Sequence, residues 1–283
     1  MEIKATDIKN LREKTGAGMM DCKKALVEAN GNYAGAEKIL REWGMAGVEK
    51  RAGRATNEGR IFVKESSSAV ALIEIACETD FVARNADFTS ASDRMVALAL
   101  EKGWTSPNAE LEKMVTAIAS IIKENITLKK VIRVQSRADE FLHTYLHGEG
   151  KIGVVVKMKS DRADAFGHEK VLAFIHDIAL HIAAFHPMFL DQSKPEPVWI
   201  KEQEDIFKKQ VELDEKMKTK PANVIQGILK GKLKKLMSEI CLLDQGFVKD
   251  EKMSVSNAMA LVSREVGAKL EITDYIYLKV GEV

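Results

Sequence analysis

Two glycine-rich segments are the first candidates for chemistry, because glycine-rich loops can bind phosphate groups. They are TGAGMM at residues 15–20 and GILKGKL at residues 227–233. A P-loop needs GxxxxGK followed by Ser or Thr, whose backbone N–H groups and hydroxyl hold phosphate and magnesium. The first segment lacks the lysine, and the second is one residue too short and ends in Leu233. Neither predicts a nucleotide site, which argues against a nucleotide-hydrolysing enzyme.

The histidines are the next candidates, because an HxxxH spacing on a helix can bind a metal ion. His143 and His147 have this spacing but lie in an alternating, strand-like run where they share a face only loosely. No carboxylate or cysteine joins them at ligand spacing. His176 and His181 are five residues apart and diverge on a helix. A structural or surface role is the simpler interpretation for each histidine except His147, and we expect no metal and no cofactor.

Cysteine usage and hydropathy indicate where the protein works. The cysteines are far apart and form no CxxC pair; they are Cys22, Cys77 and Cys241. Such usage is typical of buried thiols in a reducing compartment. The N-terminus has no apolar signal core, and no apolar run reaches about 18 residues. We therefore expect a cytoplasmic protein that does not bind membranes.

The charge balance argues against nucleic-acid binding as the main role. The 43 basic and 42 acidic residues nearly cancel. A nucleic-acid binder normally carries a basic excess that neutralises phosphates. Scattered carboxylates and lysines are instead typical of solvated helix faces.

One aromatic residue stands in an unusual context. The segment ETDFVARN, residues 78–85, follows the apolar run AVALIEIA and places Phe81 among polar neighbours. Thr79 or Asp80 can cap a helix after a strand, which would make Phe81 an anchor into the core. The alternative is a side chain offered to a partner. Local reasoning favours the core for Phe81, and less strongly for Met19 and Met20.

The secondary structure that the sequence predicts for positioning these residues changes along the chain. The first 55 or so residues predict three short helices, with Thr6 or Asp7 capping the first, Gly16 near its end and Asn32 capping the third. The third helix is expected to stop before Gly44, leaving a linker.

Strands and helices then occur in blocks, which predicts an α+β fold with antiparallel sheets. RIFVK, AVALIEIA and KIGVVVKMK are strand-like, and helices are expected from residue 86 to 124, broken at GWTSPN, and from 168 to 185. Two blocks each have the pattern of a hairpin followed by a helix, so a duplicated subdomain is an open hypothesis.

Residues 198–240 predict a charged antiparallel helical hairpin with a turn at TKP, residues 219–221. Its apolar seam could bind a partner or a second copy, or could simply close on itself. Both interpretations stay open.

Two long segments resemble the signatures of the elongation factor Ts family. They are LREKTGAGMMDCKKAL, from Leu11 to Leu26, and EIACETDFVAR, from Glu74 to Arg84. HGEGKIGVVV, HIAAFHPMFL, the Lys-Pro turn and CLLDQGFVKD continue the resemblance over nearly the whole chain. The resemblance implies a protein that binds the GTPase elongation factor Tu and promotes release of its GDP, without chemistry of its own. An RNA-associated structural protein of the translation apparatus is the alternative.

The resemblance also implies a domain order. It comprises a three-helix bundle like a ubiquitin-associated (UBA) domain at 1–54, an α+β subdomain at 55–140, a second one at 141–185 with 233–266, an inserted coiled-coil hairpin at 186–232, and a C-terminal module at 267–283. The hairpin would support a homodimer or a 2:2 complex with elongation factor Tu. Direct nucleotide, nucleic-acid or membrane binding is not expected.

Finally, the resemblance implies which residues meet the GTPase. The residues expected to dislocate its magnesium ion are Asp80, Phe81, Val82 and Ala83. Supporting contacts are expected from Thr79, His147, Gly148, Arg12, Met19, Met20 and Lys23.

Overall fold

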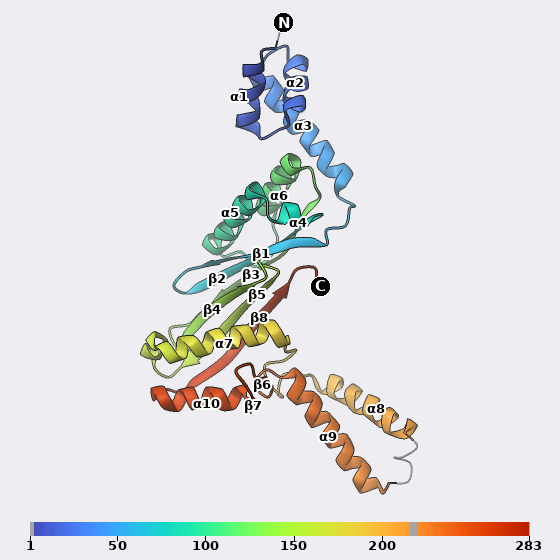
Figure 1. Ribbon diagram of the computed structural model, residues 1–283, viewed down its shortest axis with the longest axis vertical. Helices are drawn as coiled ribbons and strands as arrows, with labels where there is room; N and C mark the ends of the chain where they lie inside the picture. Colours follow the sequence, from blue (N-terminus) through green and yellow to red (C-terminus); the bar gives the residue numbers. More distant parts are fainter. Residues whose placement is uncertain (1–2, 215–219, 283) are drawn as a thin grey trace. The chain divides into compact units, whose positions relative to one another are not determined.

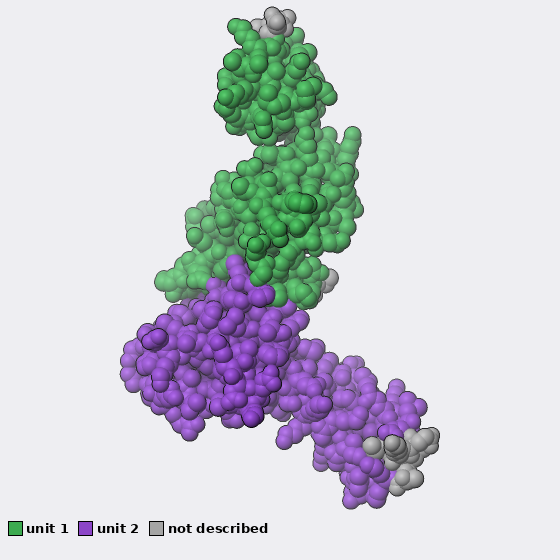
Figure 2. Space-filling model, in the orientation of Figure 1, with its two compact units in different colours: residues 1–135, 148–152, 278–283 green, residues 136–147, 153–277 purple. Residues whose placement is uncertain are grey.

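The computed structural model describes residues 3–214 and 220–282 of the chain. The chain divides into two compact units, shown in different colours in Figure 2. The first unit holds residues 1–135, 148–152 and 278–283, and the second holds residues 136–147 and 153–277. Helices and antiparallel sheets together confirm the predicted α+β class. The limits expected for the individual domains stay predictions.

The first unit begins with the expected bundle of three helices, α1 (Ala5–Thr15), α2 (Met19–Glu28) and α3 (Tyr33–Arg51) (Figure 1). Its small core consists of Leu11, Cys22, Ala25, Leu26 and Ala36, all fully buried. Two predicted caps are confirmed. Gly16 ends α1 with a left-handed φ of 69°, and the Asn32 side chain accepts a hydrogen bond of 3.0 Å from the Gly35 backbone N–H.

Two boundaries in the bundle differ from the prediction. Lys4 is the N-cap of α1, so capping by Thr6 or Asp7 is wrong, although the Asp7 carboxylate accepts a hydrogen bond from the Lys4 backbone N–H at 3.3 Å. The second difference is that α3 continues through Gly44 to Arg51. A Cβ atom at Gly44 would lie 2.8 Å from the Ser120 Cβ, so this glycine permits close helix packing and does not end a helix.

A three-stranded antiparallel sheet follows in the same unit, in the order β1-β2-β3. The strands are β1 (Glu58–Glu65), β2 (Ala69–Cys77) and β3 (Ile126–Gln135). Every residue of the central strand β2 is buried, which explains its nearly continuous apolar sequence. The helices α4 (Asp80–Ala83), α5 (Ala86–Lys102) and α6 (Ala109–Ile122) connect β2 to β3, and α5 and α6 cover one face of the sheet (Figure 1).

The second unit contains a three-stranded sheet in the order β4-β5-β8. The strands are β4 (Glu140–His147), β5 (Ile152–Ser160) and β8 (Leu270–Lys279), so the segment expected as a C-terminal module supplies the third strand. The short helix η1 (Ala163–Gly167) precedes α7 (Glu169–Phe185), which packs on β4, and α10 (Val255–Val266) packs on α7. In both sheets two consecutive strands are neighbours and the third returns after helices, which agrees with the repeated hairpin–helix pattern.

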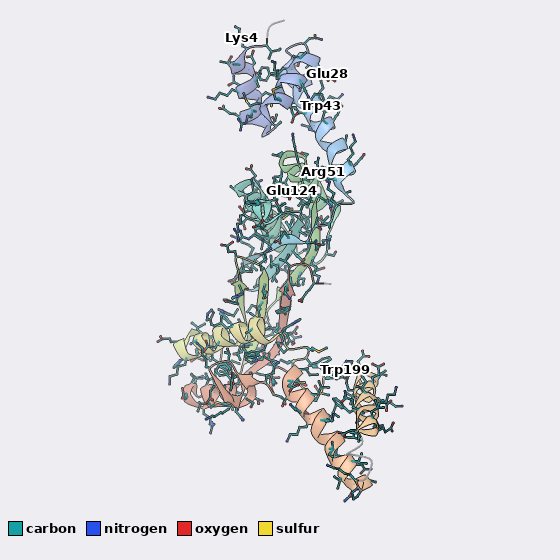
Figure 3. All side chains as sticks on the ribbon, turned by 45° about the vertical axis from the view of Figure 1, so that its right-hand side comes forward. Lys4, Glu28, Trp43, Arg51, Glu124 and Trp199 are labelled. Carbon is teal, nitrogen blue, oxygen red and sulfur yellow. The ribbon has the colours of Figure 1, made fainter. Side chains whose placement is uncertain are left out.

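The insertion in the second unit is a pair of helices, α8 (Pro197–Leu213) and α9 (Ala222–Ile240), that contact each other. Trp199, labelled in Figure 3, packs edge-on against Phe189 near the start of α8, with ring centroids 5.3 Å apart. The predicted turn begins at Thr219, and residues 215–219 lie outside the described residues. The small strands β6 (Gly246–Phe247) and β7 (Asp250–Ser254) follow α9. Within the described ranges, no helix is long and apolar enough to cross a membrane.

Candidate partner-binding site

The segment around Phe81 forms the one-turn helix α4, directly after the buried strand β2. Thr79 is its N-cap, and its hydroxyl accepts a hydrogen bond of 3.3 Å from the Val82 backbone N–H. Val82 and Ala83 are buried in the core between the β1-β2-β3 sheet and the helices α5 and α6, whereas Phe81 is 83% exposed. The core-anchor interpretation of Phe81 is therefore wrong, while the predicted cap is present. The turn buries its small residues and leaves the aromatic ring in solvent.

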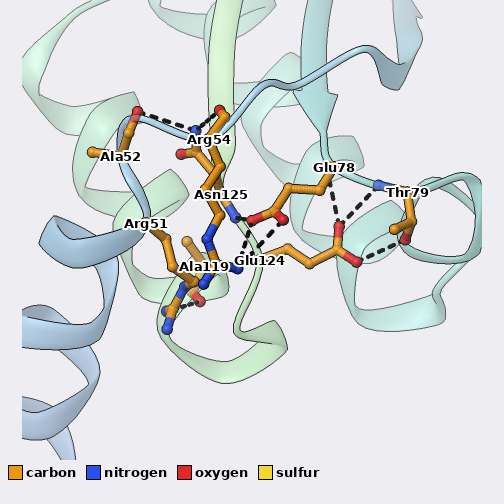
Figure 4. A network of polar contacts seen from close by, with 8 residues as sticks. All are labelled: Arg51, Ala52, Arg54, Glu78, Thr79, Ala119, Glu124 and Asn125. Carbon is orange, nitrogen blue, oxygen red and sulfur yellow. Dashed lines mark hydrogen bonds and ion pairs between the residues drawn. The ribbon is translucent and has the colours of Figure 1, made fainter.

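The turn is held in place by Glu124, which follows α6 and precedes β3 (Figure 4). One carboxylate oxygen, Oε2, accepts hydrogen bonds of 3.1 Å from the backbone N–H groups of both Glu78 and Thr79. The other oxygen, Oε1, accepts a bond of 2.7 Å from the Thr79 hydroxyl. Hydrogen bonds to a charged group are stronger than those between neutral groups. Glu124 therefore fixes the base of the helix that carries Phe81.

The neighbouring Asn125 extends this network to the segment after α3 (Figure 4). Its backbone N–H donates to Glu78 Oε1 at 2.6 Å, and its side-chain Nδ2 donates to the backbone oxygens of Ala52 and Arg54 at 3.2 and 2.7 Å. The Arg54 guanidinium also lies 3.4 Å from the Glu78 carboxylate. Residues 124 and 125 thus hold two segments that are distant in sequence.

Gly148 lies beside α4 in the first unit. It lines a hollow of about 270 Å³ together with Arg60, Asp80, Ala83, Arg84, Glu149 and Lys151. Arg84 and Glu149 form an ion pair of 3.3 Å on its rim, and Gly148 has a left-handed φ of 58°. The structure therefore brings the expected residues Asp80, Ala83 and Gly148 together.

His147 is exposed at the end of β4, in the second unit. Its Nδ1 lies 2.9 Å from the Tyr145 hydroxyl. If the hydroxyl donates, His147 carries its proton on Nε2, which then faces away from Tyr145 as a hydrogen-bond donor. The role expected for His147 at the partner stays a prediction.

The bundle carries a second exposed apolar surface. Met19 and Met20 are 42% and 63% exposed, so their expected place in the core is wrong. Met20 joins Val27 and Trp43 in a shallow groove of about 420 Å³, bordered by Lys23, Lys24 and Glu28. We call these six residues the α2–α3 groove; Glu28 and Trp43 are labelled in Figure 3. Arg12 and Lys23 are both exposed on the bundle.

The thiols of Cys77 and Cys241 are buried. Burial raises the pKa of the Cys77 thiol to about 12 and that of Cys241 to about 11, so both stay protonated and unreactive at neutral pH. Within residues 3–214 and 220–282, no group of three or more His, Cys, Asp or Glu side chains could hold a metal ion.

Sequence reasoning missed Glu78, Glu124 and Asn125. Glu124 and Thr79 are 45 residues apart, and no local pattern marks a glutamate after a helix as a partner of a distant turn. Only the return of β3 beside β2 brings them together.

The fold is that of an α+β protein with an exposed aromatic ring on a capped turn and a shallow apolar groove on a small helical bundle. The Elongation factor TS family model matches residues 78–282. A chain named elongation factor Ts from Treponema denticola is 45% identical over 282 residues, covering 99% of both chains. Those from Borrelia hermsii and Treponema pallidum (strain Nichols) are 42% and 40% identical, with at least 99% of each chain covered. The chain belongs to the elongation factor Ts family and is a translation elongation factor.

Proposed function

We propose that this chain is a guanine-nucleotide exchange factor, which binds elongation factor Tu in its GDP state and promotes release of the GDP. The observation that carries the proposal is Phe81, a large apolar ring that is 83% exposed on a helix whose N-cap, Thr79, is hydrogen-bonded to Glu124. Leaving such a ring in water forgoes about 1.5–3 kcal/mol that burial would provide. A partner that covers the ring gains this free energy.

The exchange needs no contact between this chain and the nucleotide. A GTPase holds GDP largely through its phosphates, by magnesium and by backbone N–H groups. In the proposed mechanism Phe81 enters between helices of the GTPase domain, and the resulting shift displaces magnesium and distorts the phosphate-binding loop. Coupling is reciprocal, so the factor by which this protein weakens nucleotide binding equals the factor by which nucleotide weakens its own binding.

The remaining expected residues have supporting roles in this proposal. Thr79 caps the helix, Asp80 lies beside Phe81 on the surface, and the buried Val82 and Ala83 anchor the helix in the core rather than meeting the GTPase directly. The α2–α3 groove docks the bundle on the GTPase. Methionine suits such a docking surface because its side chain is flexible and polarisable. Further contacts come from Arg12, Met19, Met20, Lys23, His147 and Gly148.

The proposal includes the assembly and the location of the protein. Apolar side chains on α8, namely Val198, Ile206 and Leu213, are exposed and support a homodimer or a 2:2 complex through the hairpin. The protein works in the cytoplasm, where aminoacyl-tRNA is delivered to ribosomes. It has no chemistry of its own, so GTP hydrolysis by the purified chain alone would contradict this part.

The direct test is release of a fluorescent GDP analogue from elongation factor Tu after addition of excess unlabelled GDP. We expect catalytic amounts of this chain to accelerate the release. An unchanged release rate at concentrations that saturate binding would refute the exchange function. Strong retention of RNA with a steep salt dependence would instead favour the RNA-associated alternative.

A further inference from the structure

We propose that Glu124 is a positioning residue for Phe81 and that it acts through the hydroxyl of Thr79. This inference rests on the proposed exchange function. It concerns a residue that touches neither the exposed face of α4 nor the α2–α3 groove, and Figure 4 shows its place in the network.

The direction of each hydrogen bond follows from the chemistry of the groups. The Thr79 hydroxyl has one proton, and at 2.7 Å from Glu124 Oε1 it donates that proton to the carboxylate. Its lone pairs are then oriented toward the Val82 backbone N–H, which donates to the same oxygen at 3.3 Å. The carboxylate therefore sets the rotamer in which Thr79 caps α4.

A four-residue helix needs such support. Isolated helices this short are unstable because nucleation costs more than one hydrogen bond returns. The Glu78 and Thr79 backbone N–H groups bind the other oxygen of Glu124, so the carboxylate holds both the cap and the chain that enters it. Val82 and Ala83 then determine which side faces the core, and Phe81 is left outside.

The same point of the chain also holds the connection from the bundle. Asn125, which is 6% exposed, binds the backbone oxygens of Ala52 and Arg54 directly after α3. Arg51, the last residue of α3, donates from its guanidinium to the Ala119 backbone oxygen of α6 at 3.2 Å. Glu124 and Asn125 are thus the common support of Phe81 and of the segment that leads to the α2–α3 groove.

The test combines Glu124→Gln with Phe81→Ala in a double-mutant cycle on GDP release. A glutamine keeps the shape of the glutamate side chain, but its NH₂ group is a donor and would face either the Thr79 hydroxyl or the backbone N–H groups of Glu78 and Thr79. We expect Glu124→Gln alone to slow the maximal release at saturating protein about five- to tenfold, because a charged acceptor is lost. The protein concentration at half-maximal rate should change less, since the groove on the bundle is intact.

In the Phe81→Ala background, Glu124→Gln should have little further effect on the rate of GDP release. The position of the turn matters little once it no longer carries the aromatic ring. Glu112→Gln on the exposed face of α6 is the matched control, and it should release GDP at the wild-type rate. Effects that multiply in the double variant, or a wild-type rate for Glu124→Gln, would overturn the inference.

Two further measurements keep the outcomes distinct. If Glu124→Gln does not fold, Thr79→Val, which replaces the hydroxyl with a methyl group, takes its place in the same cycle. Amide hydrogen exchange at Val82 in the free protein should become at least several-fold faster in either variant, whether or not the protein acts on elongation factor Tu. Unchanged protection of the Val82 amide would refute the positioning role of Glu124 even if the chain promotes GDP release. A wild-type protein that fails to promote GDP release from elongation factor Tu would refute only the proposed function.

Discussion

Replacing Phe81 with alanine separates binding from folding. The ring is 83% exposed, so its removal leaves no cavity in the free protein. Substitutions at exposed positions usually change the free energy of unfolding by less than about 0.5 kcal/mol. Alanine is also a better helix former than phenylalanine, so α4 is not weakened by the new residue. We therefore expect Phe81→Ala to unfold at the wild-type denaturant concentration.

The effect on GDP release follows from the area that a partner can still cover. A buried phenylalanine removes about 150–250 Å² from water, and nearly all of this remains available on Phe81. Full burial of such a side chain contributes about 1.5–3 kcal/mol. Since about 1.4 kcal/mol corresponds to a factor of ten, the variant should release GDP roughly ten to 150 times more slowly at limiting protein.

The assay is fluorescent-GDP release from elongation factor Tu, measured beside urea unfolding of the free variant. Leu261→Ala, which truncates another exposed apolar side chain on α10, should leave the release rate unchanged. Phe88→Ala, at a fully buried position, should instead cost about 3–5 kcal/mol of stability. A Phe81→Ala protein that releases GDP at the wild-type rate, or that unfolds as Phe88→Ala does, would refute the reasoning.

Three further substitutions test other parts of the structure. Tyr145→Phe removes the hydroxyl that lies 2.9 Å from His147 Nδ1. We expect GDP release from elongation factor Tu to be about three- to fivefold slower and the tautomer of His147 to change in ¹⁵N NMR; an unchanged tautomer would contradict this. Burial lowers the pKa of His181 from 6.5, so the unfolded state takes up the proton first and the free energy of unfolding should fall as pH drops below about 6.5. In urea unfolding at a series of pH values, His181→Asn should make this fall less steep. An equally steep fall in the wild-type protein and the variant would contradict the prediction. Met20→Ala should raise the protein concentration at half-maximal GDP release several-fold with little change in the maximal rate, whereas a lower maximal rate alone would count against docking.

The prediction for His181 rests on the arrangement of its ring. Its Nε2 lies 2.9 Å from Gln245 Oε1, while the Gln245 amide nitrogen donates to the Glu239 backbone oxygen. Nε2 therefore carries the proton, and the buried Nδ1 has no hydrogen-bond partner among the described residues. Protonation of Nδ1 would create a buried charge without an acceptor, which is costly.

Signals that act over a few residues were readable from the sequence. Asn32, Gly16 and Thr79 cap helices as their residue types indicate, because a cap depends on atoms within three or four positions. The same local logic failed at Gly44, where the reason for glycine is the approach of Ser120 from another helix. Local reasoning also failed at Phe81, because the direction of its ring depends on which neighbouring residues the rest of the fold buries.

The support of the site could not be predicted in this way. Glu124 binds Thr79 across 45 positions, and Asn125 binds Arg54 across 71. Polar residues after a helix usually face solvent, and only the closure of the β1-β2-β3 sheet turns these two inward. A single sequence contains the residues of the network but not their pairing.

The rigidity of α4 and the adaptability of the α2–α3 groove have different consequences in the proposed mechanism. A backbone segment that is already ordered loses little conformational entropy on binding, so a larger share of the burial free energy of its side chains appears as affinity. Phe81 meets this condition because Glu124, Thr79 and the buried Val82 fix its helix before any partner arrives. Met20, by contrast, can adjust to several shapes and contributes affinity that changes little between partner conformations. Only a contact that differs between the nucleotide-holding and nucleotide-releasing states can shift their balance. In the proposed mechanism, Phe81 on the fixed helix α4 is therefore the element that selects the releasing state, and the α2–α3 groove sets how long the complex lasts.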